Sequence, residues 1–266
     1  MATLPTIFVS HGAPTLALED GHPWSKALEA LGPRLGTPKA ALVVSAHWQE
    51  PSALVASAAH HPETIHDFGG FADELYAIRY PAAGAPALAA EVSALLRAAG
   101  LPTATDAQRG LDHGAWVPMR RLFPRAQIPT LQLSLPYPAT ARDLFKVGEA
   151  LSPLRDQGVL ILASGGATHN LRRLRWGETG PGVEPYAAEF DAWLWDAVQR
   201  GDRTALEGWQ SAPSARAAHP TSEHLEPLFV ALGAARPGEK VEQIHHSFSL
   251  GALSLRSFRV GALPAA

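Results

Sequence analysis

Short, almost continuously apolar runs recur along this chain of 266 residues, and helical patterns separate them. Runs of this kind, with little apolar–polar alternation, are typical of strands buried on both faces of a parallel sheet. Alternating strand and helix segments predict βαβ units and a largely parallel sheet. The expected strands cover residues 5–9, 40–46, 128–134 and 158–163. The expected helices cover residues 86–100, 139–154 and 185–200.

The tail of the chain has a different pattern. Residues 241–260, VEQIHHSFSLGALSLRSFRV, alternate apolar and polar side chains more than they follow a helical period. We therefore expect a terminal antiparallel pair at one edge of the sheet. No repeat, charge block or Ser/Gly linker divides the chain, and its 23 glycines and 23 prolines are dispersed. We expect a single α/β domain over residues 1–266, with a central mixed, largely parallel sheet flanked by helices.

Composition excludes several classes of function. The formal net charge of -3 gives no electrostatic case for binding nucleic acid or an anionic membrane. The densest basic group, RRLRW at 172–176, is short and is expected to form a solvated surface turn. Neither a secretory signal nor an apolar run of about 20 residues is present, so we expect a cytoplasmic protein without a membrane span.

Several of the apolar runs end in a loop that carries a histidine. These histidines are His11 after TIFV, His47 after ALVV and His169 after VLILA. A further loop histidine, His113, lies in LDHGAWVP. Because ligands bind at the carboxyl ends of the strands in open α/β sheets, these side chains are expected to converge. The chain has no cysteine, so His, Asp or Glu must hold any metal ion. The pattern predicts a metal-centred enzyme.

The local sequence distinguishes these histidines. His11 precedes Gly-Ala-Pro, a turn that lets the backbone approach a ligand, and His47 has the same position on another strand. Both are predicted metal ligands, although a histidine at a strand end can also simply bond a carbonyl group. His169 follows Ser-Gly-Gly and is predicted to be catalytic, with a plain helix N-terminal position as the alternative. His113 is predicted to face the site or a bound oxygen.

The segment HPTSEHLEPLFVALGAA predicts a further helix. Thr221 is a reasonable N-cap, but Pro227 would then lie deep in the helix and remove a hydrogen bond, so a later start remains open. In either case His224 is better placed than Glu223 to face an internal site. The core stripe has i, i+3, i+4, i+7 spacing and consists of Leu225, Leu228, Phe229 and Leu232.

The remaining histidines are expected to serve structure. His219 stays ambiguous, and His245 and His246 are neighbours on an expected strand, so only one of them can point inward. Surface or loop-packing roles are expected for His22, His60, His61 and His66.

The combined motifs resemble the class III extradiol ring-cleavage dioxygenases, and most closely the DOPA 4,5-dioxygenase type. The motifs are HGAP, SAHW, TIHDFGGF, DHGAW, ASGGATHN and HPTSEHLEPLFVALGA, in the order of the family. The resemblance implies that His11, His47 and His224 bind the metal. It also implies that His169 is the acid/base histidine and His113 a second pocket histidine. The implied fold, a central mixed sheet flanked by helices, agrees with the strand and helix pattern.

The implied activity is insertion of O2 into the ring of a DOPA-like catechol, giving a muconic semialdehyde. Fe(II) is the expected working metal, while Zn(II) can also occupy a three-histidine site. Many non-haem Fe(II) oxygenases use two histidines and a carboxylate, so Glu223 or Glu226 remains possible as the third ligand. In the expected mechanism, His169 accepts a catechol proton and later returns it.

Two other functions remain open from the sequence: a zinc hydrolase at the same site, and a non-enzymatic binding protein on the same fold. Arg79 or Arg109 is a candidate cation for a substrate carboxylate. The side chains that could wall an aromatic substrate are Trp48, Phe68, Phe71, Tyr76 and Trp116.

Overall fold

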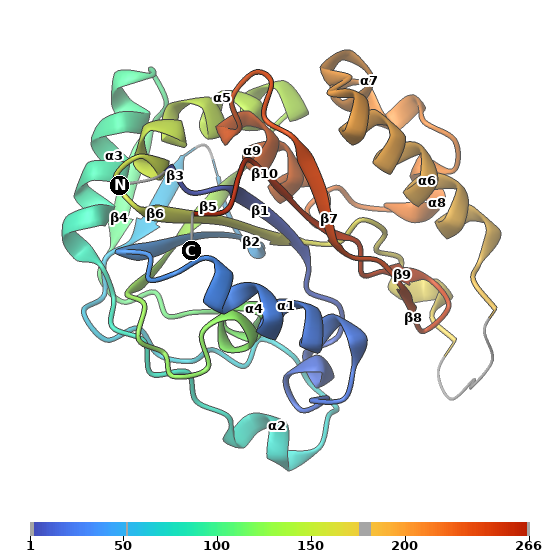
Figure 1. Ribbon diagram of the computed structural model, residues 1–266, viewed down its shortest axis with the longest axis horizontal. Coiled ribbons are helices and arrows are strands. Elements are labelled where there is room, and N and C mark those ends of the chain that lie inside the picture. The colour runs from blue at the N-terminus through green and yellow to red at the C-terminus, as the bar shows by residue number, and fades with distance from the viewer. Residues whose placement is uncertain (1–2, 52, 176–181, 265–266) are drawn as a thin grey trace.

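The computed structural model describes residues 3–51, 53–175 and 182–264. An eight-stranded sheet with the order β4-β3-β5-β2-β6-β1-β10-β7 runs through its centre (Figure 1). Its four middle strands are mutually parallel, as expected from their continuous apolar character. They are β5 (Thr130–Tyr137), β2 (Ala40–Pro51), β6 (Val159–Gly165) and β1 (Thr6–Ser10).

Antiparallel pairing occurs toward both edges of the sheet. β3 (Leu54–Ser57) pairs antiparallel with β5, and β4 (Thr103–Asp106) runs parallel to β3. At the other edge, β10 (Ser257–Val260) is antiparallel to both β1 and β7 (Val241–His245). The terminal antiparallel pair predicted from the tail is therefore confirmed. A separate two-stranded sheet joins β8 (Phe248–Ser249) to β9 (Leu253–Ser254).

Helices cover both faces of the sheet (Figure 1). α1 (Pro23–Arg34) and α4 (His113–Leu122) pack on one face. The opposite face carries α3 (Pro86–Ala98), α5 (Ala141–Leu151), α6 (Pro185–Arg200) and α9 (Glu226–Ala234). The short helices are α2 (Asp73–Ala77), α7 (Arg203–Glu207) and α8 (Ala215–Ala218), and the single 3-10 turns are η1 (Pro14–Ala17), η2 (Ser152–Arg155), η3 (Leu171–Arg173) and η4 (Trp209–Ser211).

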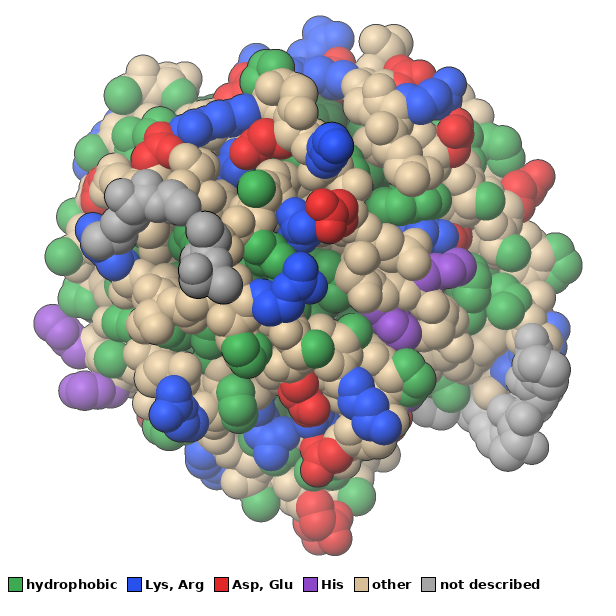
Figure 2. All heavy atoms as spheres, viewed as in Figure 1, with side chains coloured by type: hydrophobic (Ala, Val, Ile, Leu, Met, Phe, Trp, Pro, Cys, Tyr) green, Lys and Arg blue, Asp and Glu red, His purple; other side chains and the backbone are tan. Residues whose placement is uncertain are grey.

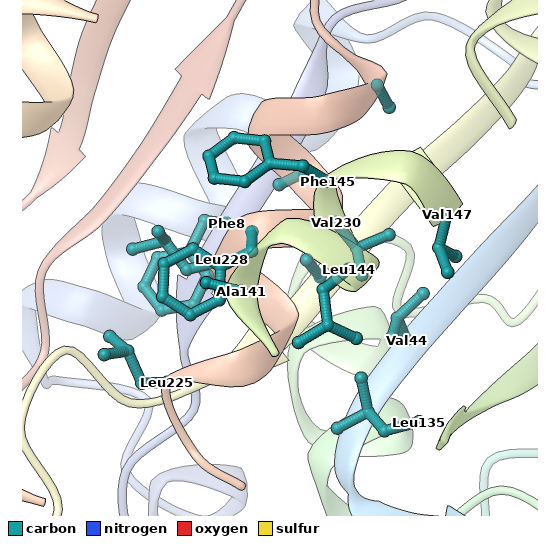
Figure 3. Close-up of a cluster of buried hydrophobic side chains, with 14 of the residues drawn as sticks. Phe8, Val44, Leu135, Ala141, Leu144, Phe145, Val147, Leu225, Leu228 and Val230 are labelled. Atoms are coloured by element: carbon teal, nitrogen blue, oxygen red, sulfur yellow. The ribbon is translucent and has the colours of Figure 1, made fainter. Parts of the chain in front are cut away.

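Two hydrophobic cores explain why the middle strands lack polar alternation. Along β1, Phe8 belongs to the core under α5 and α9, whereas Ile7 and Val9 belong to the core under α1 and α4. Side chains on both faces of a strand are thus removed from water, which favours apolar residues at every position. Figure 3 shows the first core, where strand residues such as Phe8 and Val44 lie near Leu144 of α5 and Leu228 of α9.

The helix of the HPTSEH segment starts later than its first possible cap. α9 begins at Glu226, so Pro227 lies in the first turn, where its missing N–H breaks no helical bond. The interpretation of Thr221 as N-cap was wrong: its hydroxyl donates to Glu223 Oε1 at 2.9 Å. His224 therefore lies in the loop before the helix, the arrangement that the later start predicts.

The surface shows acidic and basic side chains interspersed on the face drawn in Figure 2. Arg172 and Arg173 of the basic group are exposed, as expected, whereas Trp176 lies outside the described residues. Within the described ranges, no helix combines the length and apolar composition that crossing a membrane requires.

Candidate metal centre

The middle parallel strands bring His11 and His47 to the same, carboxyl-terminal end of the sheet. His11 follows β1 directly, and its backbone N–H donates to Gly165 O at the end of β6, at 3.0 Å. His47 lies near the end of β2, on the other side of β6. Gly12 then turns the chain with φ of +62°, a left-handed conformation that glycine adopts without a Cβ clash.

His113 is the first residue of α4, and a buried carboxylate fixes that helix end. Asp112 is the N-cap and accepts a hydrogen bond from the Ala115 N–H at 3.1 Å. The same carboxylate accepts hydrogen bonds from the Ser45 hydroxyl and the Gln132 amide, both at 2.7 Å. The position of His113 is therefore tied to β2 and β5.

His224 approaches the strand ends because two glycines leave room for its backbone. The Gly166 N–H donates to His224 O at 2.8 Å. A Cβ atom added at Gly165 would lie 2.1 Å from the same oxygen, far inside van der Waals contact. The small residues in SGGATHN thus allow the loop before α9 to close on β6.

The imidazole rings of His11, His47 and His224 form a nearly equilateral triangle. Their centroids are 5.0 Å apart for His11 and His47, 5.4 Å for His11 and His224, and 4.9 Å for His47 and His224. With metal–nitrogen bonds of about 2.1 Å, imidazoles on one ion have centroids roughly 4.5–5.3 Å apart. The triangle agrees with this spacing within about 0.1 Å.

Oxygen atoms occupy the Nδ1 side of each of these rings. His11 Nδ1 lies 2.9 Å from Ser164 Oγ, whose own proton is donated to Gly114 O. The Ser164 oxygen must therefore accept, which assigns the proton of His11 to Nδ1. The other two Nδ1 atoms face carboxylates: that of His47 lies 3.3 Å from Asp67 Oδ2, and that of His224 lies 3.0 Å from Glu223 Oε1.

The Nε2 atoms are consequently left with lone pairs directed into the site. His11 Nε2 and His47 Nε2 are 3.1 Å apart, and nitrogens bound to one ion at about 2.1 Å lie roughly 3.0–3.4 Å apart. His224 Nε2 is buried and has no hydrogen-bond partner in the described part of the chain. Nδ1–H groups held by oxygen are the usual outer contacts of histidine ligands. The donor set therefore fits a metal ion.

Three further side chains, those of His113, His169 and Glu223, have potential ligand atoms close to those of the triangle. Potential ligand atoms of His11, His47 and His113 all lie within 4.8 Å of one another. So do those of His169, Glu223 and His224. The five predicted site histidines thus fall into two adjacent groups, and the group of His11 and His47 contains His113 rather than His224, which leaves the third ligand open between these two. Glu226 is engaged elsewhere, because its carboxylate accepts from Ser222 and Gln49.

Burial controls the protonation of the site. It lowers the pKa values of His11 and His224 well below the usual range, and the neighbouring histidines lower them further. Burial also lowers the pKa of His47 to about 4. Burial raises the pKa of Asp67, but hydrogen bonds from His113 outweigh it and bring the pKa to about 2. Neutral imidazoles beside an ionised carboxylate are the protonation states that metal binding requires.

His169 lies flat against His224. The two ring centroids are 3.3 Å apart and the ring planes differ by 5°. Among the described residues, no hydrogen bond reaches the His169 ring, and burial lowers its pKa to about 4. A neutral ring with unpaired nitrogens beside a metal position can accept a proton from a ligand.

The other predicted site residues lie at varied distances from this centre. Phe68 contacts His113 with a centroid distance of 5.6 Å, and it also packs against Phe71 and Tyr76. Trp116 is fully buried with its indole N–H donated to Ile65 O, which places it in the core. Trp48 is also buried, and the Arg109 guanidinium lies 4.8 Å above its ring.

The remaining histidines mostly have structural contacts. His22 caps α1, and His245 and His246 contact Ser247 and Asp191. His219 is buried and its Nε2 bonds Ala167 O, while its Nδ1 has no partner in the residues described. His60 and His61 are exposed, and His66 bonds Ile78 O.

Sequence reasoning missed the residues that orient the imidazoles. Asp67 lies between His47 and His113 and contacts both rings. Ser164 holds His11. Both residues lie inside motifs that the sequence singled out, TIHDFGGF and ASGGATHN, so a search for oxygen atoms within those motifs could have found them.

Comparison with known proteins gives consistent matches along the chain. Residues 5–258 match the family described as the catalytic LigB subunit of aromatic ring-opening dioxygenase. The chain is 42% identical to a 4,5-DOPA dioxygenase extradiol of Beta vulgaris, with 96% of this chain and 95% of the relative covered. It is 36% identical to the protein of the same name from Escherichia coli K12, with 97% and 95% covered. The crystal structure of an uncharacterized Escherichia coli K12 protein superposes with a TM-score of 0.82 at 30% identity, covering 97% of this chain and 100% of that one.

Proposed function

The chain belongs to the LigB family of aromatic ring-opening dioxygenases, and from this premise we propose that it cleaves the ring of a catechol beside the diol, using O2. The observation that supports the proposal is the triangle of the His11, His47 and His224 rings. The Nε2 atoms of His11 and His47 lie 3.1 Å apart, and the buried Nε2 of His224 has no partner among the described residues. Two of the named relatives, at 42% and 36% identity, are 4,5-DOPA dioxygenases.

We propose Fe(II) as the working metal, bound by His11, His47 and His224. When bound, Fe(II) supplies a Lewis acid for the diol oxygens and a route for electron density from the ring to O2. Zn(II) fits the same three imidazoles but has no redox chemistry. Ser164, Asp67 and Glu223 hold the Nδ1 atoms, so they fix the direction of each ligand nitrogen.

His169 is the proposed acid/base group. Its ring stacks on His224, which holds it beside the diol position, and its nitrogens have no partner among the described residues. In the proposed reaction it accepts the proton of one diol hydroxyl. It returns that proton to an oxygen of the product as the ring opens.

His113 is proposed to contact the reacting oxygen atoms. Asp67 Oδ1 engages both its Nδ1 at 2.9 Å and its backbone N–H at 2.9 Å. Nε2 is therefore the ring atom left to hydrogen-bond the substrate. One ring carbon–carbon bond breaks and both atoms of O2 enter the product, which is a muconic semialdehyde.

Oxygen uptake after metal reconstitution tests the proposal. Protein stripped of metal is loaded with Fe(II) or Zn(II) under anaerobic conditions, mixed with a panel of substituted catechols and then exposed to air. We expect stoichiometric O2 uptake and a yellow semialdehyde absorbance with Fe(II), and neither with Zn(II). Absence of uptake with every catechol would overturn the dioxygenase proposal, and ester or amide hydrolysis with Zn(II) would replace it.

A further inference from the structure

A cavity of about 550 Å³ lies beside the metal centre. None of the predicted site histidines lines it, but its lining includes Glu223, which contacts His224 Nδ1 at 3.0 Å. Glu223 connects the two, because it lines the cavity and also has a potential ligand atom within 4.8 Å of those of His169 and His224. The volume falls within the range of about 300–1,000 Å³ that small-molecule sites usually have. The other lining residues that matter here are Gln49, Tyr137, Trp209, Arg216 and His219.

The unpaired charge in this cavity is positive. Arg216 is an exposed residue of α8, and it forms no hydrogen bond or ion pair with any residue that the structure describes. The acidic residue of the lining, Glu223, already accepts from Thr221 Oγ1 and lies 3.0 Å from His224 Nδ1. Among the described residues that line the cavity, Arg216 therefore has a free guanidinium and no second side chain is a free cation.

The two arginines considered from the sequence have other partners. Arg109 donates to Asp112 Oδ2 at 3.1 Å and lies over the ring of Trp48. Arg79 donates to the carbonyl oxygens of Tyr76 and Ile78. Arg79 also lines a different cavity, which shares no lining residue with this one. Neither guanidinium is free to receive a substrate group at this cavity.

The cavity also has apolar walls suited to a short side chain. Tyr137 and Trp209 contribute aromatic side chains to the lining. A substituent of a catechol ring could lie against them while the diol occupies the metal centre. The Arg216 guanidinium in the lining favours a substituent that ends in a carboxylate, since it can form charge-assisted hydrogen bonds with both carboxylate oxygens.

We propose that Arg216 is a specificity-determining residue that binds a carboxylate carried on the ring substituent of the catechol. The inference rests on the proposed function, because it takes the diol to be bound at the histidine centre. The cavity is then the subsite for the ring substituent, and Arg216 gives this subsite its preference for a carboxylate.

Calorimetry on the Zn(II)-loaded protein tests the assignment without turnover. The two ligands are 3-(3,4-dihydroxyphenyl)propionate and 4-propylcatechol, which share the diol and chain length but differ in charge. The variants are Arg216→Gln, Arg216→Lys and, as a matched control, Arg172→Gln. Arg172 is an equally exposed arginine three residues after His169, but it does not line the cavity.

We expect the unmodified protein to bind the carboxylate ligand about tenfold more tightly than 4-propylcatechol. R216Q should lose this preference while its affinity for 4-propylcatechol stays the same, which also shows that the variant is folded. R216K should keep part of the preference, and R172Q should keep all of it. A preference retained by R216Q, lost in R172Q or absent from the unmodified protein overturns the assignment.

The same ligands separate this inference from the proposed function. O2 uptake by Fe(II)-loaded protein with both catechols, together with no discrimination in calorimetry, supports the dioxygenase and rejects the subsite. Discrimination in calorimetry without O2 uptake keeps the subsite and rejects the dioxygenase. No binding of either catechol rejects both.

Discussion

His169 and His224 stack face to face, with centroids 3.3 Å apart and planes within 5° of parallel. The stack places a proposed metal ligand, His224, against the proposed acid/base group, His169. The nitrogens of His169 are free among the described residues. The face of the His169 ring is held by van der Waals contact, and its edge is available for proton transfer. A mutation of His169 can therefore keep the flat shape of the ring while removing the nitrogens that transfer the proton.

Replacing His169 with phenylalanine keeps a flat ring against His224 but removes both nitrogens. We expect the turnover of Fe(II)-loaded protein to fall by about a hundredfold or more, as for the loss of a general acid/base. Metal content should remain that of the unmodified protein, because the ligand triangle is intact. Oxygen uptake and metal analysis of the same sample measure both effects. Turnover close to normal would remove His169 from this role.

Metal retention should show whether His224 or His113 is the third metal ligand. His224→Ala deletes the buried Nε2 that has no partner among the described residues, so we expect the variant to lose its metal on dialysis. His113→Ala should retain metal and lose activity, because His113 is proposed to contact substrate oxygen. Metal content after dialysis against a weak chelator shows which of the two variants loses the metal. The reverse pattern would assign His113 as the ligand, in keeping with its place beside His11 and His47.

Asp67 is expected to tune metal affinity without touching the ion. It contacts His47 and His113, so Asp67→Asn removes the negative charge that orients both rings. We expect metal affinity about 10- to 100-fold lower, as for other outer contacts of histidine ligands. Competition with a chromophoric chelator measures the change. Glu63→Gln, an exposed carboxylate of the same loop, is the control and should leave the affinity unaltered.

The sequence predicts the centre of this fold better than its loops. The middle strands are recognisable because both of their faces are buried, and a histidine that follows such a strand has its position fixed by the sheet. The loop before α9 is different. The sequence leaves both a start capped by Thr221 and a later start open, and the helix begins at Glu226, where His224 packs against Gly165 and Gly166.

The contacts between loops were also beyond sequence reasoning. Asp67 reaches His47 and His113 from a loop that belongs to neither of their elements. The pairing of Arg109 with Asp112 and Trp48 likewise depends on how three segments meet. A motif indicates that such residues matter, but the partner of each side chain depends on tertiary packing.

Gly165 is expected to tolerate no larger side chain. A Cβ atom would lie 2.1 Å from His224 O and 3.3 Å from Pro227 Cγ, so the loop before α9 must move away from β6. We expect Gly165→Ala to lower the free energy of unfolding by about 1–3 kcal/mol, as overpacking does, and to weaken metal binding through His224. Urea unfolding and metal titration measure the two effects. Gly21→Ala is the control, because no atom lies within 4 Å of a Cβ there.

An ion pair remote from the metal centre should make stability depend on pH. The fully buried Arg155 donates to Leu4 O and to both carboxylate oxygens of Glu239, at 2.8 and 2.6 Å. Burial raises the pKa of Glu239, but the hydrogen bonds from Arg155 outweigh it, so the pKa of the folded state lies below that of the unfolded chain. The stabilisation is thus present above the unfolded pKa of about 4.3 and is lost as the pH falls through the folded pKa.

Glu239→Gln should therefore destabilise the protein by about 2 to 3 kcal/mol at pH 7, because the buried guanidinium loses its charged partner. The difference from the unmodified protein should shrink as the pH falls below the unfolded pKa of about 4.3 toward the lower folded pKa, and protonation of Glu239 finally makes the two proteins alike. Urea unfolding at pH 7, 5 and 3.5 measures this trend. Glu63→Gln should show no such dependence, and an equal loss for Glu239→Gln at all three pH values would mean that the carboxylate charge does not stabilise the fold.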